Sequence, residues 1–211
     1  MRVTKKIKEE QLAILEETYR GAKPELIFSN AFELLIAVIL SAQCTDKRVN
    51  VTTARLFQKA ATPEAILALG VEQLEEEIRD CGLFRNKAKN ILAACQMLCE
   101  KFGGQVPDSF ADLESLPGVG RKTANVVMSV AFHHPAIAVD THVFRISNRL
   151  KLAVGTTPLE VEKELQRVIP REKWSDAHHW LIWHGRKICK ARKPLCGTCP
   201  LADVCPSVMA E

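Results

Sequence analysis

The sequence predicts an all-α protein, and three observations lead to this prediction. Apolar side chains recur at helical spacing along most of the chain, beginning with a stripe over residues 4–20. No stretch alternates apolar and polar residues for long enough to indicate a strand. The composition, 47% hydrophobic and 26% charged, is that of a globular chain and excludes a disordered one.

Caps and glycines set the expected helix boundaries. Thr62 is placed to cap a helix that starts at Pro63, Gly82 to end the segment 71–81, and Gly103 with Gly104 to end the segment 87–102. Short turns join the segments, and a middle block at roughly 24–134 precedes a C-terminal block. The sequence alone does not say which block the first helix joins. The expected helical segments are 4–20, 31–42, 46–60, a start at 63, 71–81, 87–102, 108–115, 121–131, 141–150, 158–168 and 171–188.

Charge and hydropathy limit the possible class of protein. The net charge of +4 permits nucleic acid binding without requiring it. The longest apolar run, residues 34–42, is too short to span a bilayer, and no apolar segment follows the first six residues as a secretory signal would. We therefore expect a cytoplasmic protein without a membrane partner.

A glycine-rich turn lies between two helical segments at residues 116–124, Leu-Pro-Gly-Val-Gly-Arg-Lys-Thr-Ala. Gly118 and Gly120 allow positive φ at two alternate positions, so that the chain can reverse within a few residues. The next helix then begins with its N–H groups exposed, which favours an anion such as a DNA phosphate. The alternative is a tight turn that merely needs glycine, although the flanking residues make this motif much more specific than Gly-x-Gly alone.

Two polar residues at helix starts are candidates for chemistry. Lys122 is a cation in a first turn, where it opposes the helix dipole. It is either a solvated or phosphate-contacting lysine, or a nucleophile that forms a Schiff base. Asp140 is placed to cap the helix at 141–150, and a carboxylate held in this way could also stabilise positive charge or accept a proton. His142 more simply packs or hydrogen-bonds locally.

Four of the eight cysteines crowd into the tail, with the spacing C-x6-C-x2-C-x5-C. In a reducing compartment this set suits a metal centre better than disulfides. Only one Cys-x2-Cys pair is present, so the uneven spacing favours a 4Fe-4S cluster over zinc, which remains the alternative. Five positive charges between 186 and 193, with no acid among them, form either a phosphate-contacting loop or a solvated face. The cysteines of the tail are Cys189, Cys196, Cys199 and Cys205; Cys44, Cys81, Cys95 and Cys99 are most simply small core residues.

Taken together, these motifs resemble the endonuclease III family of helix-hairpin-helix DNA glycosylases and AP lyases. The resemblance covers nearly the whole chain and is carried by residues 40–46, 82–88, 116–127 and 139–145 together with the cysteine tail. It implies a six-helix domain at 24–134, with the hairpin at about 109–131, and a cluster domain formed by 1–23 and 135–211. The active site is expected in the cleft between these domains.

The resemblance also implies the residue roles. Lys122 matches the Schiff-base lysine and Asp140 the catalytic aspartate, while the four tail cysteines match the ligands of a structural 4Fe-4S cluster. Gln43 and Leu83 match residues that enter the gap left by an extruded nucleotide. With the hairpin and the basic loop, the expected DNA contacts are Gln43, Leu83, Gly118, Val119, Gly120, Arg121, Lys190, Arg192 and Lys193.

The implied reaction is removal of oxidised or ring-saturated pyrimidines of the thymine glycol type from double-stranded DNA, followed by β-elimination at the abasic site. The expected enzyme is a monomer associated with the nucleoid. One alternative is a monofunctional adenine-type glycosylase, which lacks the lysine at position 122 and usually carries a further C-terminal domain, whereas this sequence ends six residues after Cys205. The other is a non-catalytic DNA-binding iron–sulfur module, which would not need both Lys122 and Asp140.

Overall fold

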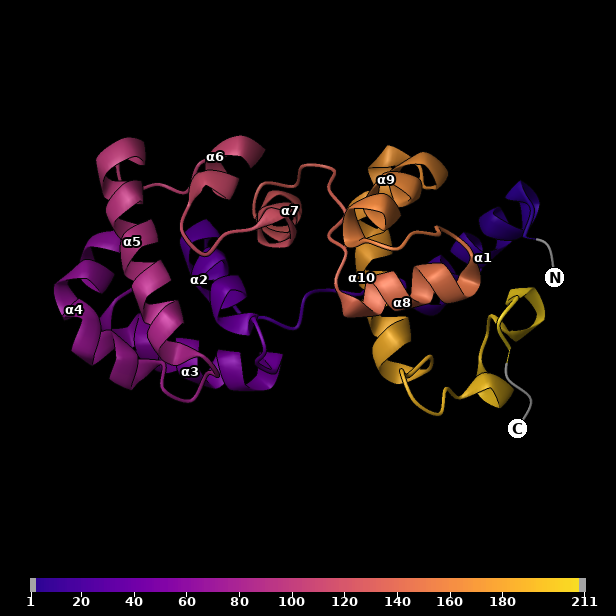
Figure 1. Cartoon of the computed structure of the whole chain (residues 1–211), viewed down its shortest axis with the longest axis horizontal. Coiled ribbons are helices and arrows are strands. Elements are labelled where there is room, and N and C mark those ends of the chain that lie inside the picture. The colour runs from indigo at the N-terminus through magenta and orange to yellow at the C-terminus, as the bar shows by residue number, and fades with distance from the viewer. Residues whose placement is uncertain (1–2, 209–211) are drawn as a thin grey trace. The chain divides into compact units, whose positions relative to one another are not determined.

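The computed structural model describes residues 3–208 and confirms the all-α prediction. These residues form ten α-helices and three short 3₁₀ turns, and they contain no strand (Figure 1). The α-helices are α1 (Lys5–Thr18), α2 (Ala31–Ser41), α3 (Asp46–Lys59), α4 (Pro63–Glu77), α5 (Phe84–Phe102), α6 (Phe110–Ser115), α7 (Arg121–Val130), α8 (Thr141–Leu150), α9 (Pro158–Val168) and α10 (Trp174–Lys187).

The chain divides into two compact units, of which Pro24–His134 is continuous in sequence. This unit holds α2 to α7 around one apolar core. Helix α2 is its centre, because its side chains from Leu34 to Leu40 are all buried and it packs against α3, α5 and α7. The apolar run at 34–42 is therefore a core helix, and the part of the chain that the structure describes contains no helix long and apolar enough to cross a membrane.

The other unit is discontinuous and combines Met1–Lys23 with Pro135–Glu211. Within it, α1 packs against α10, and α10 packs against α8. The fully buried amide of Gln11 in α1 donates to the carbonyl oxygens of Leu150 at 3.0 Å and Val204 at 2.9 Å. Both acceptors belong to the segment Pro135–Glu211, so these hydrogen bonds hold the first helix in the same unit as the cysteine tail.

Most helix starts follow the caps seen in the sequence. Thr62 accepts a hydrogen bond from Ala65 N–H ahead of Pro63, and Thr157 forms a capping box with Glu160. Helices α8 and α9 have the predicted bounds. The predicted helix at 171–188 instead opens with a 3₁₀ turn, Arg171–Lys173, before α10.

The prediction for Gly82 was wrong. Helix α4 is interrupted at Gly70, where φ is 72°, and ends at Glu77, so Gly82 does not cap it. The chain leaves the helix because a turn carries Ile78 and Cys81, both fully buried, into the core. Helix α5 then starts at Phe84, three residues earlier than predicted. At Gly82 a Cβ atom would lie 3.3 Å from the carbonyl oxygen of Gln43, so this glycine permits a close backbone approach instead.

Candidate functional site

The predicted hairpin is the turn between α6 and α7. Leu116 and Val119 are buried and anchor the turn, and the Val119 N–H donates to the Leu116 carbonyl at 3.0 Å. Gly118 has the predicted positive φ, at 79°, and a Cβ there would lie 2.8 Å from the Cβ of Asn90. Gly120 does not use this freedom: its φ is −96°, and it is the N-cap of α7, a position that takes extended backbone.

The N-terminus of α7 has no cap from its own side chains. Gly120 supplies no side-chain hydrogen bond, and the first turn contains no acidic residue. The side chains of Arg121 and Lys122 are exposed there, and the Arg121 guanidinium lies 5.0 Å from the centre of the Phe110 ring. The turn thus places N–H donors and two cationic side chains at one exposed helix end, which suits an anion.

The start of α8 is arranged differently. Asp140 follows the buried residues Ile137, Ala138 and Val139, and its Oδ1 accepts a hydrogen bond from Val143 N–H at 2.7 Å. The predicted N-cap is therefore confirmed, and this bond fixes the direction of the carboxylate. Asp140 itself is half-buried.

His142, in the first turn of α8, makes the local contact expected of a packing residue. Its Nδ1 lies 3.2 Å from Nη2 of Arg145, and burial lowers the pKa of His142. Gly185 of α10 allows this packing, because a Cβ there would lie within 3.1 Å of both side chains. Nothing in this arrangement requires a chemical role for His142.

Gln43 and Leu83 lie on two neighbouring turns of the Pro24–His134 unit. Both residues have left-handed backbone, with φ of 53° and 60°, and both are exposed. Their turns touch where Gly82 approaches the Gln43 carbonyl. Leu83 is the N-cap residue of α5 and provides no side-chain hydrogen bond. The structure thus brings together two residues that are distant in the sequence and that the resemblance assigned to one task.

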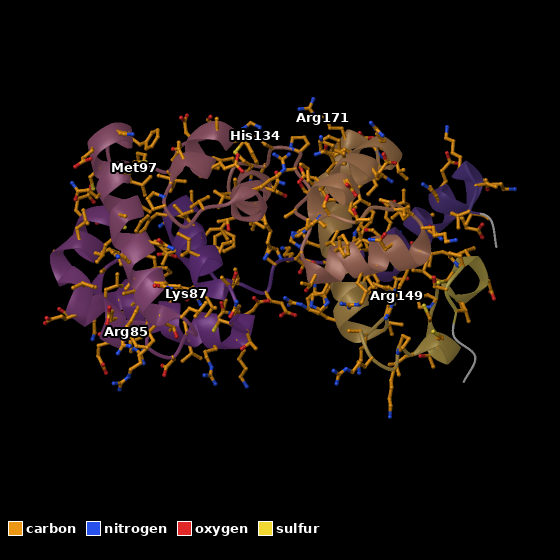
Figure 2. All side chains as sticks on the ribbon, in the orientation of Figure 1. Arg85, Lys87, Met97, His134, Arg149 and Arg171 are labelled. Atoms are coloured by element: carbon orange, nitrogen blue, oxygen red, sulfur yellow. The ribbon has the colours of Figure 1, made fainter. Side chains whose placement is uncertain are left out.

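Lys87 supports these turns and was not singled out from the sequence. Its side chain is 4% exposed, and its ammonium donates to the carbonyl oxygen of Leu40, near the end of α2, at 2.8 Å (Figure 2). Burial lowers the pKa of Lys87. The interior position of this lysine in an amphipathic helix is a signal, but its partner comes from a distant segment.

The four tail cysteines line one pocket, which they share with His184 and Arg149. Burial, followed by repulsion from the other cysteines, raises the pKa of Cys199 and Cys205. Thiolates at this spacing therefore need a cationic group between them. Within residues 3–208, no three His, Cys, Asp or Glu side chains converge as the ligands of one metal ion must. The pocket thus brings together the four cysteines that the sequence singled out.

A buried hydrogen-bond relay reaches this pocket from α1. The Tyr19 hydroxyl lies 3.0 Å from His184 Nδ1, and His184 Nε2 lies 3.8 Å from Cys199 Sγ. Burial lowers the pKa of His184 to about 4 and raises that of Tyr19 to about 12. A neutral ring that accepts from the tyrosine at Nδ1 has its proton at Nε2, directed toward the sulfur.

Arg149 connects the cysteine pocket to the basic loop. Its Nη1 lies 3.3 Å from Cys189 Sγ and 2.7 Å from the Lys190 carbonyl oxygen, while its Nη2 donates to the Ala191 carbonyl at 2.9 Å (Figure 2). The side chains of Lys190, Arg192 and Lys193 are exposed beyond these bonds. No sequence pattern marked Arg149, because its partners lie 40 to 42 residues away.

This combination of hairpin, aspartate-capped helix and cysteine tail defines a class of protein. Residues 36–171 match the family described as "HhH-GPD superfamily base excision DNA repair protein", where HhH denotes the helix-hairpin-helix. Residues 189–205 match the "Iron-sulfur binding domain of endonuclease III".

Comparison with individual proteins narrows the class. Endonuclease III of Haemophilus influenzae is 53% identical over 205 residues, which cover 97% of this chain and 96% of that protein. Endonuclease III of Bacillus subtilis is 55% identical over 190 residues, covering 90% and 87%. The chain belongs to the endonuclease III family.

Solved structures agree with this assignment. A trapped endonuclease III–DNA covalent intermediate and a non-covalent endonuclease III–DNA complex each match with a TM-score of 0.94 and 51% identity, over 98% of this chain and 97% of theirs. The family and its iron–sulfur domain also settle the choice of cofactor, which is a 4Fe-4S cluster and not zinc.

Proposed function

We propose that this base excision repair glycosylase and AP lyase acts on oxidised or ring-saturated pyrimidines in double-stranded DNA, of which thymine glycol is the type, and on abasic sites. It acts as a monomer in the cytoplasm, on the nucleoid. The net charge of +4 and the cationic side chains of the hairpin and the basic loop support a DNA substrate.

The hairpin is the proposed backbone anchor. Gly118, Val119 and Gly120 present the open N-terminus of α7, and Arg121 adds a charge that can meet the same phosphate. A second anchor is the basic loop formed by Lys190, Arg192 and Lys193. Such contacts hold the enzyme on duplex DNA without reading sequence, as a repair enzyme requires.

Gln43 and Leu83 are the proposed wedge. The target base is inaccessible inside the stack and must be flipped out, at a cost that is lowest for a damaged base. Leu83 is 55% exposed, and Gln43 lies on the adjoining turn. One apolar and one hydrogen-bonding side chain can fill the gap and contact the widowed base.

Lys122 and Asp140 carry the proposed chemistry. The Lys122 amine attacks C1′ of the extruded nucleotide, and the bond from C1′ to the base breaks with the electron pair leaving on the base. The Asp140 carboxylate, aimed by its bond to Val143 N–H, stabilises positive charge on the sugar or takes the proton of the attacking amine. The C1′–O4′ bond of this adduct then breaks, O4′ takes up a proton and the C1′–N bond becomes an imine. The imine acidifies the C2′ hydrogen, and loss of that proton expels the 3′ phosphate.

Cys189, Cys196, Cys199 and Cys205 are the proposed cluster ligands, one for each iron. The cluster has a structural role when bound: it cross-links the tail. The chain's own residues extend this support, because Arg149 joins the ligand Cys189 to the loop carbonyls and the Tyr19–His184 pair reaches Cys199.

The observation that carries the proposal is an exposed lysine in the first turn of the open hairpin helix, in a chain 51% identical to a protein caught as a covalent DNA intermediate. Borohydride reduction with a thymine glycol duplex tests it, because only an imine is fixed as a stable cross-link. We expect trapping by the wild type and none by Lys122→Gln, with turnover reduced by about 10³-fold or more, ~4 kcal/mol, and DNA affinity retained.

Lys101→Gln is the matched control, since Lys101 is an exposed lysine at the end of α5, and it should trap normally. Strand cleavage by Lys122→Gln at the wild-type rate would refute the nucleophile. If the wild type binds DNA but is not trapped, a monofunctional adenine-type glycosylase or a binding module is favoured instead. Activity on a duplex with an adenine mispair then distinguishes these two alternatives.

A further inference from the structure

Two cysteines that the proposed chemistry does not use, Cys44 and Cys81, lie on the two neighbouring turns that carry Gln43 and Leu83. Cys44 directly follows Gln43, and Cys81 precedes Leu83 by two residues. Cys81 belongs to the apolar core of this unit, and Cys44 packs against the same core. Gly82 also approaches the Gln43 carbonyl here, so backbone and side-chain contacts join the same two turns.

The surroundings of this pair suit thiol chemistry. Cys81 is fully buried, and its Sγ lies 3.7 Å from the Thr52 hydroxyl. Burial raises the pKa of the Cys81 thiol, and the charge of the Lys87 ammonium, which the Leu40 carbonyl holds, opposes that rise.

The two cysteines differ in access to solvent. Cys44 is half-buried, whereas Cys81 is covered. A surface pocket next to them is lined by Thr45, Thr52 and Asp80, which are a neighbour of Cys44, the contact of Cys81 and a neighbour of Cys81. A small oxidant can therefore reach Cys44 first, and Cys81 is placed to resolve the product. A half-exposed thiol beside a resolving cysteine is the arrangement found at redox-sensitive sites.

We propose that Cys44 and Cys81 form a peroxide-sensitive site that closes to a disulfide and slows the enzyme. The Cys44 thiolate attacks hydrogen peroxide; an S–O bond forms, the O–O bond breaks, and hydroxide leaves and takes up a proton. The Cys81 sulfur then attacks the Cys44 sulfenic acid; the S–S bond forms and water leaves. Two thiols thus supply the two electrons that reduce one peroxide to two waters.

The proposed effect on turnover rests on the proposed function of Gln43 and Leu83. A disulfide brings the sulfurs to about 2.05 Å, much closer than two thiols in contact. The backbones of the two turns already meet at Gly82, so they cannot simply approach each other and must rotate. Rotation displaces Gln43 and Leu83, which must enter the duplex together.

Peptide mapping tests the site without any need for activity. The holoenzyme, with its cluster spectrum monitored, is treated with hydrogen peroxide, alkylated and digested with trypsin, which isolates Cys44 in peptide 21–47 and Cys81 in peptide 80–85. We expect these peptides joined, lighter by two hydrogens than their sum, and separated by dithiothreitol. Separate recovery with Cys81 alkylated and Cys44 either alkylated or carrying added oxygen would overturn the proposal.

Three variants control the experiment. Cys44→Ser should lose the joined peptide. Cys81→Ala should lose it as well, and this second variant keeps the test valid if one substitution disturbs the core. Cys95→Ala is the matched control, because Cys95 is a fully buried cysteine of the same core, and it should still give the joined peptide.

Strand cleavage of a thymine glycol duplex tests the consequence. Oxidised wild type should lose most of its rate and recover it with dithiothreitol, while Cys44→Ser should not respond. An unchanged cleavage rate in protein that contains the Cys44–Cys81 disulfide would overturn the proposed inhibition. Because mapping is independent of turnover, a failed site and a failed glycosylase assignment give different results.

Discussion

Helices α7 and α8 begin in opposite ways, although both starts belong to the proposed reaction. Helix α8 is closed by the carboxylate of Asp140, 2.7 Å from Val143 N–H. Helix α7 begins at Gly120 with no side-chain cap and two cations in its first turn. In α8 the carboxylate proposed for the chemistry also accepts a hydrogen bond from the helix. In α7 the first N–H groups have no side-chain acceptor and remain available to a bound anion.

The difference shows where stability is given up for binding. Every other N-cap in the unit Pro24–His134 is a polar side chain that accepts a helix N–H, except Leu83 of α5. The two uncapped starts of this unit, at Leu83 and Gly120, are thus the two that the proposed function places against DNA. A missing cap costs about 1 kcal/mol, and a bound phosphate can supply the absent acceptor.

Asp140 offers the largest test of the comparison, since its two roles can be separated. Asp140→Asn keeps an oxygen for Val143 N–H but removes the charge, so turnover should fall about 10²- to 10⁴-fold with little change in unfolding free energy. Asp140→Ala should lose the same activity and a further ~1 kcal/mol of stability. Single-turnover kinetics and urea unfolding measure both, and an active Asn variant would leave Asp140 as a cap only.

Gly118 tests the turn that opens α7. Gly118→Ala meets both a left-handed φ of 79° and the Cβ of Asn90 at 2.8 Å, so we expect a loss of about 2–3 kcal/mol in unfolding free energy. Gly120→Ala is its control, because φ there is −96° and a Cβ meets nothing within 4 Å. Equal urea midpoints for the two variants would contradict this account.

Gly120→Asp transfers the cap of α8 to α7. The space at Gly120 accommodates the side chain, so stability should rise by a few tenths of a kcal/mol. The new carboxylate occupies the phosphate position and repels DNA, so affinity should fall about tenfold, ~1.4 kcal/mol. Fluorescence anisotropy measures the DNA affinity of both Gly120→Asp and Gly120→Ala, and their difference gives the effect of the charge alone. Equal affinities would mean that no phosphate binds at this helix end.

Substitutions in the basic loop should have the smallest effect on DNA affinity. They test whether α7 is the only element that binds phosphate. Neutralising Lys190, Arg192 and Lys193 together should reduce the slope of log affinity against log salt by about 0.9 for each phosphate that the loop neutralises in the wild type. Arg149 is left intact, so the loop keeps its support. An unaltered slope would assign phosphate binding to the hairpin alone.

Local signals in the sequence predicted much of this molecule. Asp140, Thr157 and Pro158 act on the residues beside them, and α8 and α9 accordingly have the predicted bounds. The hairpin and the cluster cofactor were also predicted, since each depends on a short motif, and the all-α class was predicted from helical periodicity along the chain.

Features set by distant contacts were missed. Gly82 was misassigned because burial of Ile78 and Cys81 ends α4 early, and packing of this kind has no local signature. The sequence showed only that Gly120 permits positive φ; its extended backbone follows from its position as the N-cap of α7. The support of the wedge turns by Lys87 likewise depends on a partner from a distant helix.

The discontinuous unit has a consequence for biosynthesis. Gln11 is made among the first residues, yet one of its two carbonyl partners, Val204, follows 193 residues later. At a translation rate of roughly 5 to 20 residues per second, about 10 to 40 seconds pass between the synthesis of Gln11 and that of Val204. The hairpin unit is complete by His134 and can fold on the ribosome while α1 is still unpaired. The newly made chain thus completes the unit that contains the hairpin before the unit that contains the cysteine tail.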